Sequence, residues 1–600
     1  MKSIFILFSN ILKETTLIKY KTIRFVKKYW LESLLISIMA LLIFVNLDWR
    51  YFASDESYNV TMGQYILKNH GLPKIWDGEN IITTINGNDF NDDLICINLN
   101  YGAYYITAFM QLIFGKNTYI IRLPFAFMGI FSAIIWYKYF KKITHTGIAK
   151  IFLTIYCLSI PLIIYFRNAN YFAPSLFFIG LMYLYYKKGE KENKKTLWTL
   201  FILFSIIQFH INYMLFIFTI FPILFDYLIA RNFKLSFFIS YAVIFVNTFP
   251  FFLWMRYNFS LLQSEYRSAF LMDFSLGYYR FIEQFWHVSF YIAPIIPLLA
   301  IYFVCKLFKK KKHDKNFIYD IQFIRVKEKI FPNKFVISLI FTILFNFVFL
   351  CFFTNEFETR YYLAIFPFLY ISIAIIIYKL FTIDKLASVI MILLLLFTNV
   401  INYIPYNIVA MLQLDMNNNV VRTLISSPIP RSYISDGNQS VSSLDYRSDF
   451  IEYISSYSKP VKDSINVIMT YLNENASSED TVNAFGTESW TNSIQYYTNL
   501  RLVNNLRPGF DSWAKDKNYY NADKFYKLVF CPDELVDWVI VSNPLIGEKV
   551  NSVNRIYMDS KKYKKIVLKT NLSNMANDIW LYNFGPYNKN ETIIIYRKLV

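Results

Sequence analysis

The segment LESLLISIMALLIFVNL, residues 31–47, and the Asp55-Glu56 pair that follows it decide the fold of this chain. The segment is apolar, and its length suits a membrane-spanning helix, which takes roughly 17–25 residues. The residues before it are basic, with Lys13, Lys19, Lys21, Arg24, Lys27 and Lys28. Because basic residues before a first span hold that end of a chain in the cytoplasm, we predict that both carboxylates lie just outside the membrane.

The composition indicates a membrane protein. Of the 600 residues, 55% are hydrophobic and 20% are aromatic, and the mean hydropathy is +0.32. A soluble domain is less apolar and less aromatic. Long apolar runs recur over the first two thirds of the chain, which predicts a polytopic α-helical membrane protein in contact with membrane lipids. The net charge of +19 does not indicate a nucleic-acid partner, because much of the Lys and Arg falls in short loops between predicted spans.

The apolar runs predict about eleven spans. They cover residues 31–47, 119–139, 148–165, 172–186, 197–209, 211–229, 235–254, 288–307, 335–353, 361–378 and 386–404. The basic clusters between them are Lys138 with Lys141 and Lys142, the lysines of 187–195, Arg231 with Lys234, and Lys309 to Lys312. All of these clusters fall on the cytoplasmic side in this order of spans. Residues 104–114 are either interfacial or re-entrant, or they cross and bring the count to twelve or thirteen.

Three regions follow from this order. Residues 1–30 form a basic cytoplasmic N-terminus, and residues 31–404 form a membrane domain whose first outer loop covers about 48–117. From residue 405 to residue 600 the composition turns polar and no long apolar run occurs. Residues 481–485 and 538–542 have strand patterns, and residues 464–473 have helical spacing. We expect a small α/β domain there, outside the cytoplasm.

Ionisable residues lie at the ends of the predicted spans. The centres of 172–186, 235–254 and 335–353 carry none. Ion-coupled transporters place charged groups near the midplane, so this pattern argues against that mechanism. The charges gather instead at the outer face, where a crevice open to the membrane suits a substrate with a lipid tail and a polar head.

Several short motifs occur in a fixed order along the membrane part. They are Asp55-Glu56-Ser57-Tyr58, then residues 63–73 (GQYILKNHGLP), Tyr104-Tyr105, Arg122-Leu123-Pro124, Arg167-Asn168-Ala169-Asn170-Tyr171, and Arg360-Tyr361-Tyr362 with Pro367. By these motifs, residues 30 to 400 resemble the GT-C fold glycosyltransferases, in the branch of protein O-mannosyltransferases and lipid A aminoarabinose transferases. Two departures leave the identity of the donor open: the chain has Asn100-Tyr101-Gly102 where relatives carry a Pro-Pro motif, and Asn168 and Asn170 replace a Glu and an Arg.

The resemblance implies roles for particular residues. It implies that Asp55 is a general base, and that Glu56 is either its partner or a solvated neighbour. It implies substrate binding by Arg122, Arg167, Tyr171, Arg360 and Tyr361. The alternative for Arg122 and Arg360 is that they anchor at the interface by snorkelling. Asp92 and Asp93 either orient an acceptor or bind a metal ion, or they form an ordinary loop turn.

The expected function is an integral glycosyltransferase of the inner (plasma) membrane. It would move a hexose or pentose from a polyprenyl-phosphate-linked sugar to a glycan, lipid or protein acceptor, with inversion. The sequence requires no cofactor and leaves a divalent metal open. Three alternatives remain: a glycan ligase or polymerase that uses a diphosphate-linked donor, a flippase for a lipid-linked sugar, and a non-catalytic scaffold built on an enzyme fold.

Overall fold

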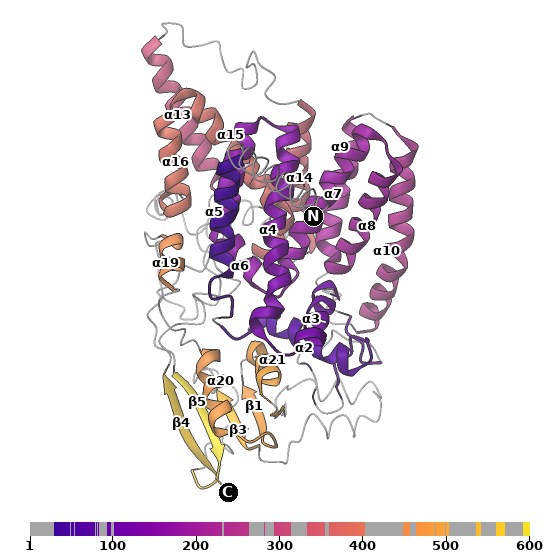
Figure 1. Cartoon of the computed structure of the whole chain (residues 1–600), viewed down its shortest axis with the longest axis vertical. Coiled ribbons are helices and arrows are strands. Elements are labelled where there is room, and N and C mark those ends of the chain that lie inside the picture. Colours follow the sequence, from indigo (N-terminus) through magenta and orange to yellow (C-terminus); the bar gives the residue numbers. More distant parts are fainter. Residues whose placement is uncertain are drawn as a thin grey trace, which may run out of the picture.

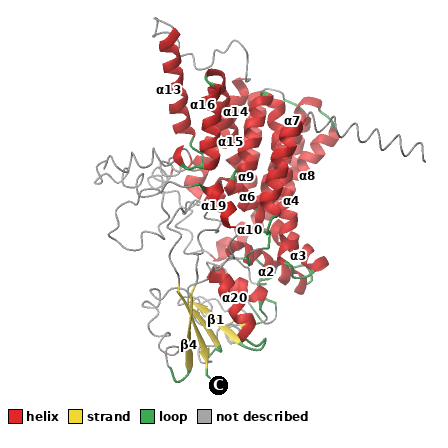
Figure 2. Ribbon diagram, turned by 60° about the vertical axis from the view of Figure 1, so that its left-hand side comes forward, coloured by secondary structure: helices red, strands yellow, loops and turns green. Residues whose placement is uncertain are grey.

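The computed structural model of the chain is mostly helical, with a sheet near the C-terminus (Figure 1). It describes residues 29–48, 50–52, 54–77, 80, 82, 93–97, 101–230, 233–262, 281, 288, 293–313, 333–353, 359–401, 448–456, 464–485, 488–498, 500–502, 536–541, 560–569 and 592–599. Helices run along the long axis of the molecule and form a bundle, and the sheet lies at one end of it (Figures 1 and 2).

The helices of the bundle match the predicted spans. They are the first helix, Tyr29–Phe44, then α4 (Thr118–Ile143), α5 (Thr146–Leu158), α6 (Ile160–Arg167), α7 (Phe172–Glu192), α8 (Lys195–Ile211), α9 (Tyr213–Ala230), α10 (Leu235–Leu262), α13 (Ile295–His313), α14 (Asn333–Phe353), the 3-10 helix η2 (Thr359–Ile365), α15 (Phe366–Ile383) and α16 (Lys385–Phe397). Each predicted span overlaps at least one of them. A helix satisfies its own backbone hydrogen bonds, which a segment surrounded by lipid requires.

Within the described residues, five helices are long and apolar enough to cross a membrane, and a sixth is added if the bent pair α5–α6 counts as one span. The five are Thr118–Ile143, Tyr213–Ala230, Leu235–Trp254, Lys334–Cys351 and Arg360–Ile383. The chain is therefore a multi-pass membrane protein. The count of eleven crossings stays a prediction.

The predicted span 148–165 is broken in two. The axes of α5 and α6 differ by 56°, with Ser159 between them. Pro161 stands in the first turn of α6 and has no N–H to continue the hydrogen-bond ladder of α5. The break lets α6 end at Arg167, close to the end of the first helix. A second junction is tighter, because Asn212 alone separates α8 from α9, and its side chain accepts from the N–H of Leu215.

Two helices lie across the end of the bundle that faces the sheet (Figures 1 and 2). They are α2 (Ser54–Lys68) and α3 (Tyr101–Phe114). Gly63 allows their close approach, since a Cβ there would lie 2.5 Å from Oγ1 of Thr107. Thr107 and Gln111 of α3 donate to the backbone carbonyls of Asn59 and Val60. The predicted segment 104–114 is thus a helix packed on α2.

The C-terminal sheet has five strands in the order β2-β1-β3-β5-β4. Its strands are β1 (Thr481–Phe485), β2 (Arg501–Leu502), β3 (Trp538–Val541), β4 (Tyr563–Lys569) and β5 (Thr592–Lys598). β1 runs parallel to β2 and β3, while β5 is antiparallel to both β3 and β4. The helices α20 (Ser464–Asn475) and α21 (Glu488–Tyr497) accompany it, and α19 (Asp449–Ser456) precedes them. Apolar side chains from α20 and the strands, among them Ile468, Leu472 and Trp538, share one core.

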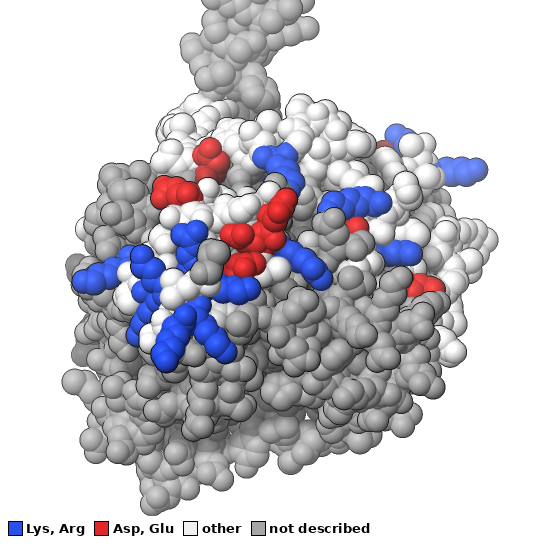
Figure 3. Space-filling model, turned by 90° about the horizontal axis from the view of Figure 1, so that it is seen from below, with Lys and Arg blue, Asp and Glu red and all other residues white. Residues whose placement is uncertain are grey.

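Strand β4 is at an edge of the sheet and is strongly basic. Exposed lysines on it or next to it are Lys561, Lys562, Lys564, Lys565 and Lys569. In the view of this end of the molecule, Lys and Arg side chains project around a central group of carboxylates (Figure 3). Lysines on an edge strand discourage pairing with the strand of another chain.

Candidate active site

The two carboxylates of the predicted site lie in the first turn of α2 and point to different surroundings. Consecutive residues of a helix are rotated by about 100° around its axis. Asp55 keeps 24% of its side chain exposed, whereas Glu56 keeps only 3%. The local helix geometry therefore divides the acidic pair into one carboxylate at the surface and one in the interior.

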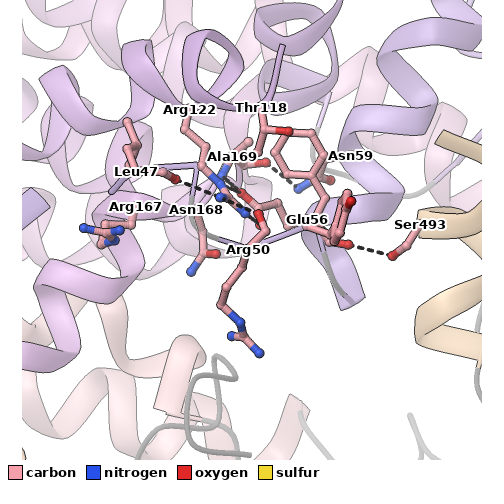
Figure 4. A network of polar contacts seen from close by, with 12 residues as sticks. Leu47, Arg50, Glu56, Asn59, Thr118, Arg122, Arg167, Asn168, Ala169 and Ser493 are labelled. Carbon is pink, nitrogen blue, oxygen red and sulfur yellow. Dashed lines mark hydrogen bonds and ion pairs between the residues drawn. The ribbon is translucent and has the colours of Figure 1, made fainter. Parts of the chain in front are cut away.

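Glu56 is held in a buried, bidentate ion pair with Arg122 of α4 (Figure 4). Nε of Arg122 lies 2.8 Å from Oε1, and Nη2 lies 2.7 Å from Oε2. The N–H of Ala169 donates to Oε1 at 2.7 Å. Two parallel charge-assisted bonds of this kind fix both side chains firmly. The alternative that Glu56 is a solvated neighbour of Asp55 is therefore wrong.

Arg122 also organises the chain that leads into α2. Its Nη1 donates to the carbonyls of Leu47 at 2.8 Å and Arg50 at 3.0 Å. Its guanidinium carbon lies 4.8 Å from the ring centroid of Phe52, a cation–π distance. Four of its five N–H donors are thus used inside the protein. Arg122 does not snorkel, and these contacts favour a structural role over the predicted phosphate binding.

Arg167 caps the end of the first helix. Its Nη1 lies within hydrogen-bond distance of the carbonyls of Leu42, Ile43 and Val45, at 3.1, 2.9 and 2.7 Å, and its Nη2 donates to the carbonyl of Asn46. The last carbonyls of a helix have no partner within it, and a cation there also suits the helix dipole. Asn46 has the left-handed backbone, φ 49°, that commonly ends a helix. The contacts again favour structure over phosphate binding.

Asp55 faces Arg360, so a second pair of predicted site residues lies together in the structure. Nη1 of Arg360 forms an ion pair with Oδ2 of Asp55, joining η2 to α2 across 305 positions of sequence. Both side chains remain partly exposed, 24% for Asp55 and 16% for Arg360. The Arg360 guanidinium lies 5.5 Å from the ring centroid of Tyr361. A carboxylate and a guanidinium thus lie side by side at a place that solvent reaches.

The remaining predicted residues are dispersed. Tyr171 is buried, and its carbonyl accepts from the N–H of Ser175 at the start of α7. Asp93 lies in an exposed turn, as the turn interpretation expects, and Asp92 lies outside the described residues. In the part of the chain that the structure describes, no three His, Cys, Asp or Glu residues are grouped so that they could hold a metal ion.

Sequence reasoning missed the contribution of α21. Oγ of Ser493 donates to the carbonyl of Phe52 at 2.6 Å, and the N–H of Phe52 donates to the hydroxyl of Tyr497 at 3.0 Å. Figure 4 shows Ser493 reaching the site from the side of the C-terminal region. These residues are more than 400 positions from Phe52, and a hydroxyl that binds backbone leaves no pattern in sequence.

Comparison with known proteins gives structural neighbours only. No family model and no curated protein matches this chain. Among solved structures, it is similar to ArnT from Cupriavidus metallidurans bound to undecaprenyl phosphate, with a sequence identity of 12% and a TM-score of 0.49. The match covers 94% of this chain and 98% of the ArnT chain. It is also similar to the oligosaccharyltransferase of Archaeoglobus fulgidus in complex with Zn and sulfate, with a sequence identity of 11% and a TM-score of 0.44. That match covers 87% of this chain and 69% of the oligosaccharyltransferase chain.

Proposed function

We propose that this chain is a membrane glycosyltransferase that moves a sugar from a polyprenyl-phosphate donor to a hydroxyl acceptor. The observation that carries the proposal is the partly exposed Asp55–Arg360 ion pair beside the sealed Glu56–Arg122 pair. The buried Glu56–Arg122 pair stabilises the fold. The partly exposed Asp55–Arg360 pair can separate, so that each side chain contacts a substrate instead.

The chemistry is a single displacement at the anomeric carbon. The acceptor oxygen forms a bond to that carbon while the bond from the carbon to the phosphate oxygen breaks. Asp55 takes the acceptor proton, and the lipid phosphate leaves with the bonding electrons. Arg360 stabilises the negative charge that grows on the phosphate. Displacement from the opposite face inverts the anomeric centre.

The resting ion pair suits this exchange. Solvent reaches both side chains of this pair, so separating Asp55 from Arg360 costs less than separating a fully buried ion pair. A phosphate can bind the guanidinium with two hydrogen bonds and take the place of the carboxylate. Asp55 is then free to accept the proton of the acceptor hydroxyl. Donor binding would in this way prepare the base.

The ends of two helices support one orientation of the protein in the membrane. α4 and α7 both begin beside Glu56, through Arg122 and Ala169, and both carry lysines in their last turns. A helix rises about 1.5 Å per residue, so these lysines lie at the opposite end of the bundle. Basic ends mark the cytoplasmic side. We infer that Asp55, Arg360 and the C-terminal sheet face the outside of the inner (plasma) membrane.

The deciding experiment is transfer by the purified protein in detergent. Sugar-loaded polyprenyl phosphate and polyprenyl diphosphate are offered separately, with glycan, lipid and peptide acceptors. We expect transfer from the monophosphate donor. Transfer from the diphosphate alone would favour a ligase or polymerase. Movement of the lipid across vesicles without a new glycosidic bond would favour a flippase and overturn the proposal.

The orientation has its own test. A cysteine placed at Val600 should react with a membrane-impermeant reagent added to whole cells, and one placed at Lys188 should not. Protection at the C-terminal position would refute an outer-face site.

A further inference from the structure

We propose that Tyr497 and Ser493 are positioning residues that hold Asp55 in place, so that the C-terminal region is part of the active site. This inference rests on the proposed function, because it assigns to these residues a role in the rate of transfer. The two side chains act through Phe52, three residues before Asp55.

Helix α21 binds both backbone groups of Phe52. Ser493 donates to its carbonyl at 2.6 Å, and Tyr497 accepts from its N–H at 3.0 Å. The two residues are one turn apart on α21, so their hydroxyls lie on the same face. Phe52 therefore has no freedom to rotate its peptide groups without breaking a bond to α21.

The hydroxyl of Tyr497 links two parts of the membrane region. It lies 3.0 Å from the N–H of Phe52 and 2.9 Å from Oγ1 of Thr118 at the start of α4. Burial raises the pKa of Tyr497 far above its usual range, although nearby Arg122 acts in the opposite direction. The hydroxyl is therefore protonated at neutral pH and can accept from Phe52 while it donates to Thr118.

Aromatic packing reinforces these hydrogen bonds. The ring of Tyr497 stacks on Phe52, with centroids 5.7 Å apart, and meets the edge of Tyr51 at 4.5 Å. The guanidinium of Arg122 lies 4.8 Å from the ring centroid of Phe52. Phe52 thus contacts both the C-terminal region and a member of the buried ion pair, and these contacts help to set the direction in which α2 begins.

Further contacts make the docking of α21 extensive. Oγ1 of Thr61 donates to the carbonyl of Asn492 at 3.1 Å, and Nζ of Lys116 donates to the carbonyl of Tyr496 at 3.3 Å. From α20, Oδ1 of Asn466 accepts from the N–H of Tyr51. Since α2 starts two residues after Phe52, a shift of this loop moves the carboxylate of Asp55 relative to Arg360. A misplacement of about 1 Å can cost up to about 10²-fold in rate.

The test compares Tyr497→Phe with Tyr563→Phe in the full-length protein. Tyr563 is the matched control, because it is a buried tyrosine of strand β4 whose hydroxyl donates to the carbonyl of Val536, two residues before strand β3. We expect Tyr497→Phe to lower the single-turnover rate about tenfold or more and to leave the Kd of the donor lipid within about twofold. Tyr563→Phe should keep the wild-type rate.

Amide hydrogen exchange around Phe52 gives a readout that needs no activity. It should become faster in Tyr497→Phe and in Ser493→Ala, and it should not change in Tyr563→Phe. Two results for Tyr497→Phe would overturn the positioning role. One is faster amide exchange with a wild-type transfer rate, and the other is wild-type values for both the exchange and the transfer rate. If the wild type transfers no sugar, the proposed function fails, and the exchange still decides whether α21 holds the loop.

Discussion

Two arginine–carboxylate pairs stand next to each other in this protein and differ in nearly every respect. Glu56 and Arg122 are buried, share two hydrogen bonds and have additional backbone partners. Asp55 and Arg360 share an ion pair and keep 24% and 16% of their side chains exposed. One pair joins α2 to α4, and the other joins α2 to η2.

The difference separates an ion pair that stabilises the fold from one that can take part in the proposed reaction. Removing one partner of a buried pair leaves an uncompensated charge, which typically costs about 3–5 kcal/mol. Opening a pair that solvent reaches costs less, because water can solvate the separated groups. A group that must change partners in every catalytic cycle belongs in the second class. The buried Glu56–Arg122 pair fixes the first turn of α2 against α4, and Asp55 lies in that turn.

The largest effect should come from Asp55→Asn. The asparagine is nearly isosteric but cannot take the proton of the acceptor, so we expect the single-turnover rate to fall about 10²–10⁴-fold. The melting temperature should fall less than in Glu56→Gln, since the Asp55–Arg360 pair is more exposed than the Glu56–Arg122 pair. Glu474→Gln is the control, because Glu474 is an exposed carboxylate on α20. A wild-type rate in well-folded Asp55→Asn would assign the base to another residue.

Glu56→Gln should lower the free energy of unfolding. Glutamine keeps the shape but leaves the charge of buried Arg122 uncompensated, at a cost of about 3–5 kcal/mol in the free energy of unfolding. Chemical denaturation in detergent measures this cost, and the transfer rate is measured on the folded fraction. Wild-type stability together with a large loss of rate would remove the distinction between the two pairs and make Glu56 a chemical group.

Arg360→Ala should weaken donor binding by about tenfold or more, because a charge-assisted hydrogen bond contributes about 1.5–3 kcal/mol. Arg360→Lys should lose less, since lysine keeps the charge and gives up the two-pronged contact. The KM and Kd of the donor lipid report the effect. Lys68→Ala is the control, because Lys68 is an exposed cation on the same helix as Asp55, paired with Asp77. Unchanged donor affinity in both Arg360 variants would make Arg360 an interfacial anchor.

The smallest effect on transfer should come from Arg167→Lys. A lysine can reach fewer of the carbonyls that end the first helix, and we expect a loss of about 1–3 kcal/mol in stability. The rate per folded molecule and the donor KM should not change. If the donor KM rises as it does for Arg360→Ala, Arg167 binds phosphate as the resemblance implied.

Much of the fold could be predicted from the sequence. Each predicted span overlaps at least one helix, because apolar runs of this length have few other structures open to them in a membrane. The strands at Thr481–Phe485 and Trp538–Val541 and the helix at Ser464–Asn475 also follow their local patterns. The break at Ser159 was missed, although Pro161 was the available signal.

The site could be predicted only in part. The carboxylates and arginines were the right residue types, but their partners decide their roles. Arg167 binds backbone carbonyls of the first helix, and any sequence of that length supplies such carbonyls. Which of Asp55 and Glu56 faces inward depends on the rotation of α2, which is fixed by contacts with α3, α4 and α21. Tertiary contacts of this kind have no local signature in the chain.

The distances along the chain between contacting residues have a consequence for synthesis. Asp55 meets Arg360 across 305 positions, and Phe52 meets Tyr497 across 445. Under the proposed function, the helix that bears the base is therefore synthesised long before the residues that orient it. Nascent and truncated chains would hold an incomplete centre, and a complete one would form only in the last fifth of translation. A partly made chain would then be unable to react with the lipid carrier of the proposed donor.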